Sequence, residues 1–268
     1  MEMPISKRRR ILRYNGEALM EIMDEIVTEY AITIYINEQE LATMVCTPLY
    51  LEHLVIGFLA SEGIIRSFEQ IENLLIDENK GMAYVTIGGG FELNQQLYNK
   101  RYITSCCGKS RQSFYFYNDA QTAKVVSHET TLSIPDVFRL MAAMQDQSIS
   151  FHRTGGLHNA ALCSKDSVLV ARSDIGRHNA LDKIYGHCLQ HGISLDDKII
   201  AFSGRISSEI ILKVSKIGAA IILSKSAPTE LALDMAEQLG ITAIGFIRGN
   251  LLNIYSHPER IKETATGS

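Results

Sequence analysis

The sequence predicts an α/β fold in which a smaller α+β domain precedes a larger α/β domain. Two patterns in the 268 residues support this prediction. Before residue 90, short alternating apolar segments flank one amphipathic segment, as in hairpins around a single helix. After about residue 101, short apolar segments alternate with segments of helical length, which is typical of strand–helix–strand crossovers and a largely parallel sheet. We therefore predict domains at residues 1–100 and 101–268.

The elements of the first domain are predicted from turn and cap residues. A turn at residues 37–40 separates two alternating segments and so predicts a hairpin. A helix is predicted to start at Thr47-Pro48, because a hydroxyl residue caps a helix and proline suits its first position. Gly63 is a suitable end for this helix. Residues 74–87 then predict a second hairpin.

The elements of the second domain are predicted from the period of the apolar residues. Strands are predicted at residues 167–171, 198–202, 220–223 and 241–246, and helices at residues 135–145, 179–190, 206–217 and 228–239. The carboxyl ends of parallel strands meet at one edge of a sheet, where such folds bind their ligands. We therefore expect the residues that follow these strands to form the site.

Charge and composition exclude several classes of protein. The net charge of −4 and the pI near 6.1 give no support for nucleic-acid binding, and the basic residues 7–10 are interpreted as a solvated tail. No apolar run approaches the roughly 20 residues of a membrane span, and no secretory signal core follows the basic stretch. Five cysteines, an odd number, suit a reducing compartment. We expect a cytoplasmic protein without membrane or nucleic-acid partners.

Each predicted strand is followed by a turn of small residues that carries a cation. The four cations are Arg177, Arg205, Lys225 and Arg248. Free backbone N–H groups at helix N-termini, hydroxyl groups and fixed cations together bind anions, usually phosphate. Ordinary helix capping explains any one such turn, but four turns at one edge favour a phosphate or nucleotide site.

Cys106 and Cys107 are candidate reactive residues in a predicted loop. Lys109 and Arg111 are close in sequence, and nearby cations favour the thiolate, which is the nucleophilic form of cysteine. Such a thiolate can attack a persulfide or a disulfide. The alternative is that both are unreactive loop thiols. The other cysteines lie in apolar segments and are predicted to be core or near-core residues: Cys46, Cys163 and Cys188.

The cysteine and histidine pattern predicts no metal ligands. Adjacent cysteines are a poor arrangement for two ligands of one zinc ion. His158 follows two glycines, much as a histidine enters a helix in zinc deaminases, but Ala160 stands where that chemistry needs a glutamate. The later Pro-Cys-x-x-Cys motif of deaminases is also missing from the sequence. A deaminase-like scaffold is compatible with these residues, whereas deamination is not supported.

Several motifs resemble those of the FdhD family. They are Thr104-Ser105-Cys106-Cys107-Gly108-Lys109, residues 155–161, residues 172–183, residues 203–209 and the region from Gly245 to Pro258. The match runs from about Tyr30 to Ile261, and its block at residues 174–183 is highly specific.

In one respect the sequence departs from that family, whose pattern is often Cys-x-x-Cys-Gly-Lys. Thr104 stands at the first cysteine position, and the second thiol is the neighbouring Cys106. Cys107 keeps the glycine and lysine neighbours and is therefore preferred as the carrier residue, with Cys106 as the second candidate.

The resemblance implies a cytidine-deaminase-like three-layer α/β domain, without zinc, beside a smaller α+β domain. It implies a sulfurtransferase of the carrier type, which takes sulfur as a cysteine persulfide from a cysteine desulfurase. The acceptor is the molybdenum bis(molybdopterin guanine dinucleotide) cofactor before its insertion into formate dehydrogenase, and GDP is expected to mimic that cofactor. A homodimer is expected, since carriers of this size are often dimers. The family's cofactor-binding segment corresponds to Phe246, Ile247, Arg248, Gly249, Asn250 and Leu251.

Two other functions remain compatible with these motifs. One is a cofactor-binding chaperone whose thiols only ligate or shield metal. The other is a nucleotide-processing hydrolase on a deaminase scaffold, although the missing glutamate and cysteine ligands argue against it. Persulfide trapping distinguishes the carrier from the chaperone, and stoichiometric zinc would support the hydrolase.

Overall fold

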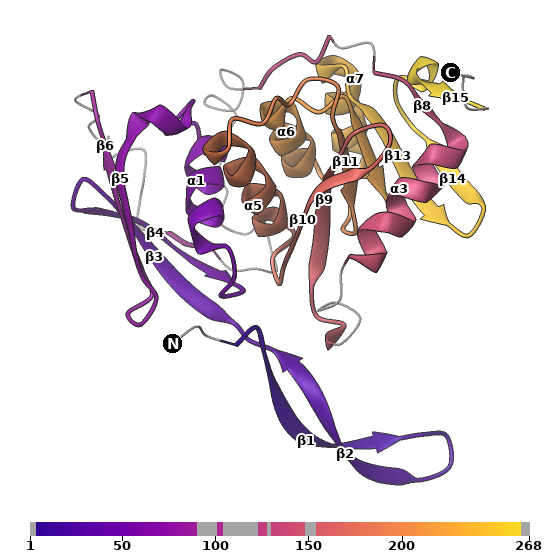
Figure 1. Ribbon diagram of the computed structural model, residues 1–268. Coiled ribbons are helices and arrows are strands. Elements are labelled where there is room, and N and C mark those ends of the chain that lie inside the picture. The colour runs from indigo at the N-terminus through magenta and orange to yellow at the C-terminus, as the bar shows by residue number, and fades with distance from the viewer. Residues whose placement is uncertain (1–3, 90–100, 104–122, 128–129, 148–153, 264–268) are drawn as a thin grey trace.

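Two β-sheets are joined through a pair of packed helices, as Figure 1 shows for the computed structural model. The structure describes residues 4–89, 101–103, 123–127, 130–147 and 154–263. Helix α1 (Leu51–Ser61) lies beside the first sheet and packs against α5 (Arg177–Gln190) of the second. Nine of the eleven residues of α1 are buried, as expected for a helix that is covered on opposite sides.

The first sheet has five strands in the order β5-β6-β3-β4-β7. Their bounds are Tyr30–Ile36 (β3), Gln39–Cys46 (β4), Ile71–Asp77 (β5), Met82–Ile87 (β6) and Arg101–Ile103 (β7). Both predicted hairpins are confirmed, because β3 pairs antiparallel with β4 and β5 with β6. Strand β7 pairs with β4 although it begins at residue 101, and the domain boundary near residue 100 stays a prediction.

The predicted start of the first helix, with Thr47 as its cap and Pro48 as its first residue, is wrong by three residues. Helix α1 begins at Leu51, after Tyr50 adopts a left-handed conformation with φ 55°. Thr47 does not cap the helix, because its N–H and its hydroxyl group both donate to the Asp174 carboxylate. A tertiary contact has therefore replaced the expected local cap.

The basic residues near the N-terminus form a strand, so their interpretation as a tail is wrong. Strand β1 (Ser6–Tyr14) pairs antiparallel with β2 (Leu19–Val27) in a hairpin that extends away from both sheets (Figure 1). Arg10 lies 2.6 Å from Glu21 on the neighbouring strand. Most residues of β1 are exposed on both faces, so the sequence lacks the apolar alternation that predicts a half-buried strand.

The second sheet has six strands in the order β10-β9-β11-β12-β13-β14. Their bounds are His158–Cys163 (β9), Val168–Asp174 (β10), Ile199–Phe202 (β11), Ile221–Ser224 (β12), Thr242–Arg248 (β13) and Leu251–Ile254 (β14). Only the pairs β11–β12 and β12–β13 are parallel, so the expected largely parallel sheet is a mixed sheet. The prediction missed β9, which lies antiparallel between β10 and β11, and the edge strand β14.

Strands β10 to β13 nevertheless all run in the same direction. Strand β9 is antiparallel to both of its neighbours, so β10 is parallel to β11 across it. The helices that connect these strands lie on one side of the sheet and α3 lies on the other, which gives three layers (Figure 1). The predicted helices are confirmed as α3 (Ile134–Asp146), α5, α6 (Ser208–Ile217) and α7 (Glu230–Leu239). A short parallel pair, β8 (Leu132–Ser133) with β15 (Ile261–Lys262), completes the structure.

Candidate functional site

The four turns that follow β10 to β13 meet at one edge of the second sheet. Each turn contacts the next in the order of the strands. A Cβ atom built on Gly204, in the second turn, would lie 3.4 Å from Arg177 Cβ in the first. The third turn donates to the second through the Ser226 hydroxyl, which lies 3.1 Å from Ser203 O. Arg248 Nε, in the fourth turn, donates to Lys225 O at 3.1 Å. We call this row of turns the strand-end edge.

The four predicted cations differ in their exposure at the strand-end edge. Arg205 and Arg248 are exposed, whereas Arg177 and Lys225 are half-buried. Three of the turns lead into helices of ten or more residues, α5, α6 and α7, whose first N–H groups have no partner within the helix. Cations and free N–H groups together give this edge the means to bind an anion.

The predicted cofactor segment is the tight turn between β13 and β14. Phe246 adopts φ 52°, which is unusual for a bulky residue, and its ring is 40% exposed. The Arg248 guanidinium lies 5.9 Å from the centre of that ring. Ile247 is only 3% exposed, so its side chain belongs to the core and can offer a ligand only its backbone. The last residues of the segment, Gly249, Asn250 and Leu251, are exposed.

A polar network lies at the same edge, where β9 begins. Ser173 donates to the side-chain oxygen of Asn159 at 2.6 Å, and the Asn159 N–H donates to the Ser203 hydroxyl at 2.9 Å. His158 begins strand β9 and not a helix, which corrects the comparison with zinc deaminases. Burial, followed by the charge of Arg177, lowers the pKa of His158. Its imidazole is therefore neutral at physiological pH.

Asp174 connects the strand-end edge to the first sheet. One carboxylate oxygen accepts from the Gly176 N–H at 2.8 Å and from Asn179 Nδ2 at 2.9 Å. The other accepts from Lys183 Nζ at 2.6 Å and from the Thr47 hydroxyl at 2.9 Å. Lys183 and Asp174 are both fully buried. The network fixes the turn before α5, and the sequence could not reveal it because Thr47 is 127 residues from Asp174.

The two candidate carrier residues, Cys106 and Cys107, lie outside the described residues. The described chain before them ends at Ile103, which pairs with Met44 in β4. Cys107 follows Ile103 by four residues in the sequence. The predicted burial of the other cysteines, Cys46, Cys163 and Cys188, is confirmed.

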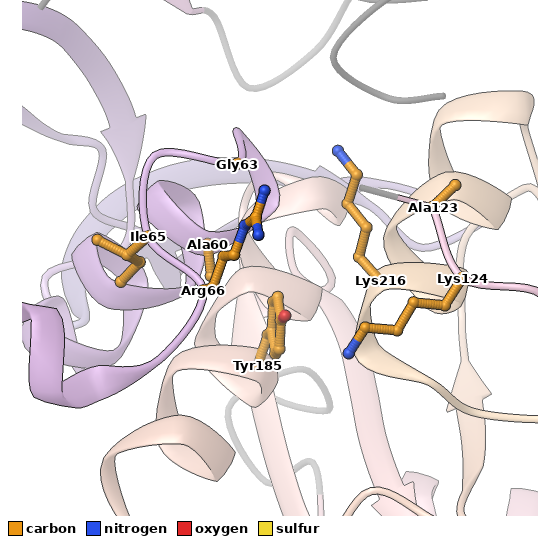
Figure 2. Close-up of a pocket in the computed structure, with 8 residues that line it drawn as sticks. All are labelled: Ala60, Gly63, Ile65, Arg66, Ala123, Lys124, Tyr185 and Lys216. Carbon is orange, nitrogen blue, oxygen red and sulfur yellow. The ribbon is translucent and has the colours of Figure 1, made fainter. Parts of the chain in front are cut away.

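A cavity of about 280 Å³ lies away from the strand-end edge, at the carboxyl end of α6. Figure 2 shows three cationic side chains around it, Arg66, Lys124 and Lys216, together with Tyr185. Lys216 Nζ donates to Ser61 O at 2.6 Å, so this cation is held in place. None of the described residues that line the cavity is acidic, which makes it a second place where an anion could bind. The sequence analysis missed this cavity because its residues come from separate segments.

Within the described residues, no helix is both long enough and apolar enough to cross a bilayer.

Comparison with known proteins shows the family of the chain. The FdhD/NarQ family model matches residues 27–262. The "Sulfur carrier protein FdhD" of Halalkalibacterium halodurans is 54% identical over 262 residues, which is 97% of each chain. The protein of the same name from Bacillus subtilis is 52% identical over 255 residues, 95% of this chain and 97% of its own. A crystal structure from Desulfotalea psychrophila, assigned as a formate dehydrogenase accessory protein, shares the fold with a TM-score of 0.79 at 23% identity, covering 97% of this chain and 100% of its own. This chain belongs to the FdhD/NarQ family.

Proposed function

We propose that this protein is a sulfur carrier that supports formate dehydrogenase, with Cys107 as the preferred carrier residue and Cys106 as the second candidate. The similarity to sulfur carrier proteins is 54% identity over nearly the whole of both chains, and this observation carries the proposal. The sulfur is taken from a cysteine desulfurase and delivered to the molybdenum bis(molybdopterin guanine dinucleotide) cofactor. The cofactor is the substrate of the carrier and then enters formate dehydrogenase.

Burial of the other thiols supports the assignment of the carrier residues. Of the five cysteines, Cys46, Cys163 and Cys188 are buried. Burial raises the pKa of Cys46, and it raises the pKa values of Cys163 and Cys188 to about 12. These thiols are therefore protonated at neutral pH and out of reach of a partner, so they are poor nucleophiles. If the chain carries sulfur on a cysteine, Cys106 and Cys107 are the remaining candidates.

The proposed first step is a thiol–persulfide exchange. The Cys107 thiolate attacks the terminal sulfur of the desulfurase persulfide, a new S–S bond forms, and the desulfurase cysteine leaves as a thiolate. The position of β7, the strand that precedes the carrier cysteines, supports delivery of the sulfur at the strand-end edge. Ile103 pairs with Met44, and β4 ends two residues later at Cys46, next to the Thr47 that binds Asp174. The carrier cysteines thus follow closely on a strand that ends beside that edge.

The strand-end edge is the proposed binding site for the guanine dinucleotide part of the cofactor. Arg177, Arg205, Lys225 and Arg248 provide positive charge for its phosphates, and guanidinium groups bind phosphate oxygens in pairs. The exposed Phe246 ring offers a flat apolar surface to a base. GDP is expected to bind here as a mimic of one half of the cofactor.

Four finer expectations stay predictions. The three layers and the mixed sheet support a cytidine-deaminase-like scaffold, but other α/β folds share these features. The homodimer, the cytoplasmic location and the division at residue 100 rest on the sequence alone. Zinc-dependent deamination is not proposed, because Ala160 lies inside β9 at the position that would need a catalytic glutamate.

Intact mass spectrometry after incubation with a cysteine desulfurase and cysteine tests sulfur carriage. We expect the wild-type chain to gain one sulfur atom, and we expect Cys107→Ala to lose this gain. Cys163→Ala is a matched control, because Cys163 is a buried thiol and the gain should remain. Loss of the gain in Cys106→Ala alone would move the carrier role to Cys106. No gain in any variant would favour the cofactor-binding chaperone, and full formate dehydrogenase activity with both single variants would contradict the proposal.

Calorimetric titration with GDP tests the strand-end edge separately. Arg205→Ala and Arg248→Ala each remove an exposed cation, and a charge-assisted hydrogen bond contributes roughly 1.5–3 kcal/mol. We therefore expect the affinity for GDP to fall about 10-fold to 100-fold in each variant. Arg8→Ala, an exposed arginine on β1, should leave the affinity unchanged. Equal affinities of all four proteins would place the nucleotide elsewhere, and the cavity of Figure 2 would be examined next.

A further inference from the structure

Three histidines meet on the outer side of the contact between α1 and α5. His53 comes from α1, while His187 and His191 lie four residues apart at the end of α5. Each histidine contributes one ring nitrogen to the cluster, and these three nitrogens lie within 4.8 Å of one another. Histidines four residues apart on one helix face are a recurrent arrangement for binding zinc. Because this cluster lies at the carboxyl end of α5, it is separate from the strand-end edge at the amino end of that helix.

The close crossing of two helices explains how the cluster forms. A Cβ atom on Gly57 would lie 1.8 Å from Asp182 O, and one on Gly186 would lie 1.9 Å from His53 O. The helix backbones therefore touch at these glycines. Gly186 directly precedes His187, so the contact of its backbone with His53 places the two imidazoles side by side. Their ring centres are 4.8 Å apart.

The hydrogen bonds of the rings make His187 Nδ1 an acceptor on the cluster side, whereas the Arg172 guanidinium lies 3.5 Å from His53 Nδ1 and keeps the His53 proton on Nε2 until Arg172 moves away. His191 Nδ1 donates to His187 O at 2.9 Å, so Nε2 of His191 keeps its lone pair. Such a bond from the second ring nitrogen is the usual support of a metal-binding histidine. His187 Nδ1 lies 3.4 Å from His53 Nε2 and 3.1 Å from the Arg172 guanidinium, so it acts as an acceptor.

We propose that His53, His187 and His191 form a binding site for a divalent transition metal ion that favours imidazole ligands, such as Zn²⁺. Tetrahedral zinc with nitrogen ligands at about 2.0–2.1 Å requires these nitrogens to be roughly 3.3 Å apart. The His187–His53 pair is already at 3.4 Å. His191 is exposed, so its side chain can shift to bring Nε2 into place as the third ligand. A hollow of about 410 Å³ lies on the His53 side of the cluster, where Tyr50, Glu52 and His53 line it.

Arg172 is the competitor of the metal ion at this site. Its guanidinium is stacked over the Tyr50 ring at 4.0 Å from the ring centre and donates to His187 Nδ1. A metal ion bound there must displace this cation and is repelled by its charge. The site therefore binds metal only when Arg172 moves away, and a neutral side chain at this position should tighten binding.

The test uses the full chain without a polyhistidine tag and with Cys106→Ser and Cys107→Ser, so that the carrier thiols cannot bind metal. Equilibrium dialysis against Zn²⁺ measures affinity, and Co²⁺ serves as the spectroscopic probe. We expect one Co²⁺ per chain, with the ligand-field absorption of nitrogen ligands and no sulfur-to-metal charge transfer. His191→Gln should weaken binding by at least about 100-fold, since even loss of a supporting hydrogen bond weakens metal binding 10-fold to 100-fold. Arg172→Met should strengthen binding.

The control variant is His257→Gln, which removes a surface histidine beside two carboxylates, Glu237 and Glu259, and should leave binding unchanged. Circular dichroism confirms that each variant is folded, and His191 is partly outside the helix, so its replacement should not disturb packing. Metal binding that survives in His191→Gln would overturn the proposal, as would the failure of wild-type chain and Arg172→Met to bind Co²⁺. Weaker binding in Arg172→Met would show that Arg172 supports the ion and would overturn its role as a competitor.

Discussion

Lys183 is a fully buried lysine, and its replacement gives the sharpest test of how the two sheets are joined. Its ammonium group lies 2.6 Å from the Asp174 carboxylate. At an effective dielectric constant near 20, two unit charges at that distance attract by about 6 kcal/mol. Burial of the two ions opposes this attraction by several kcal/mol for each of them. The ion pair as a whole therefore changes the free energy of unfolding little. Either charge buried without the other strongly destabilises the folded state.

Lys183→Met should therefore lower the free energy of unfolding by about 3–5 kcal/mol, because it leaves the Asp174 charge buried with hydrogen bonds but no counter-ion. Asp174→Asn should lower it by a similar amount, since it leaves a buried ammonium group. The double variant removes both charges. We expect it to be less destabilised than the sum of the single variants by at least about 2 kcal/mol, as is typical of residues in one network.

Urea unfolding at pH 7, followed by circular dichroism, measures these free energies. Lys80→Met is the matched control, because Lys80 is exposed and pairs with Asp77 at the surface, where such pairs contribute at most about 1 kcal/mol. A loss of less than about 1 kcal/mol in Lys183→Met would refute the reasoning. Additive losses in the double variant would refute it as well, since they would mean that the two side chains do not stabilise each other.

Two further predictions concern the helix crossing and the strand-end edge. Gly57→Ala should lower the free energy of unfolding by more than about 2 kcal/mol, although alanine favours a helix by about 1 kcal/mol, because its Cβ would lie 1.8 Å from the backbone oxygen of Asp182. Stability that is equal or higher in urea unfolding would contradict the close crossing. The pKa of His158 is lowered by burial, so the unfolded chain binds more protons below pH 6.5 and stability should fall as the pH drops through that value. His158→Gln should reduce this slope between pH 7.5 and 5.5, and an unchanged slope would show that other groups cause it.

Local patterns predicted most of the elements but not their order in space. The helix at residues 135–145 has apolar residues at the helical period, and the structure places it at Ile134–Asp146. Strand β9 was missed because its buried run is short and follows a glycine-rich segment that suggested a helix start. That omission led to the wrong expectation of a largely parallel sheet. The strand directions still agree at β10 to β13, so the four predicted cations lie at one edge.

The contacts that the sequence could not predict join residues that are far apart along the chain. Thr47 reads locally as a helix cap, yet its hydroxyl binds Asp174. Lys183 lies in a buried stretch of α5, and only the fold brings the Asp174 carboxylate to it. The helical spacing of His187 and His191 is visible in the sequence, but the third member, His53, is 134 residues away from His187. Such sites depend on tertiary packing, which periodicity does not encode.

The glycine crossing of α1 and α5 also determines how stiff the molecule is. The backbones of α1 and α5 touch at Gly57 and Gly186, so no side chains separate the two helices there. The buried ion pair between Lys183 and Asp174 lies close to this contact. We therefore expect the two sheets to move together, so that Ile103 in the first sheet keeps its distance from the strand-end edge in the second. We expect no hinged closure between the two sheets. We expect the proposed sulfur donor and sulfur acceptor each to bind to a surface whose shape is already set.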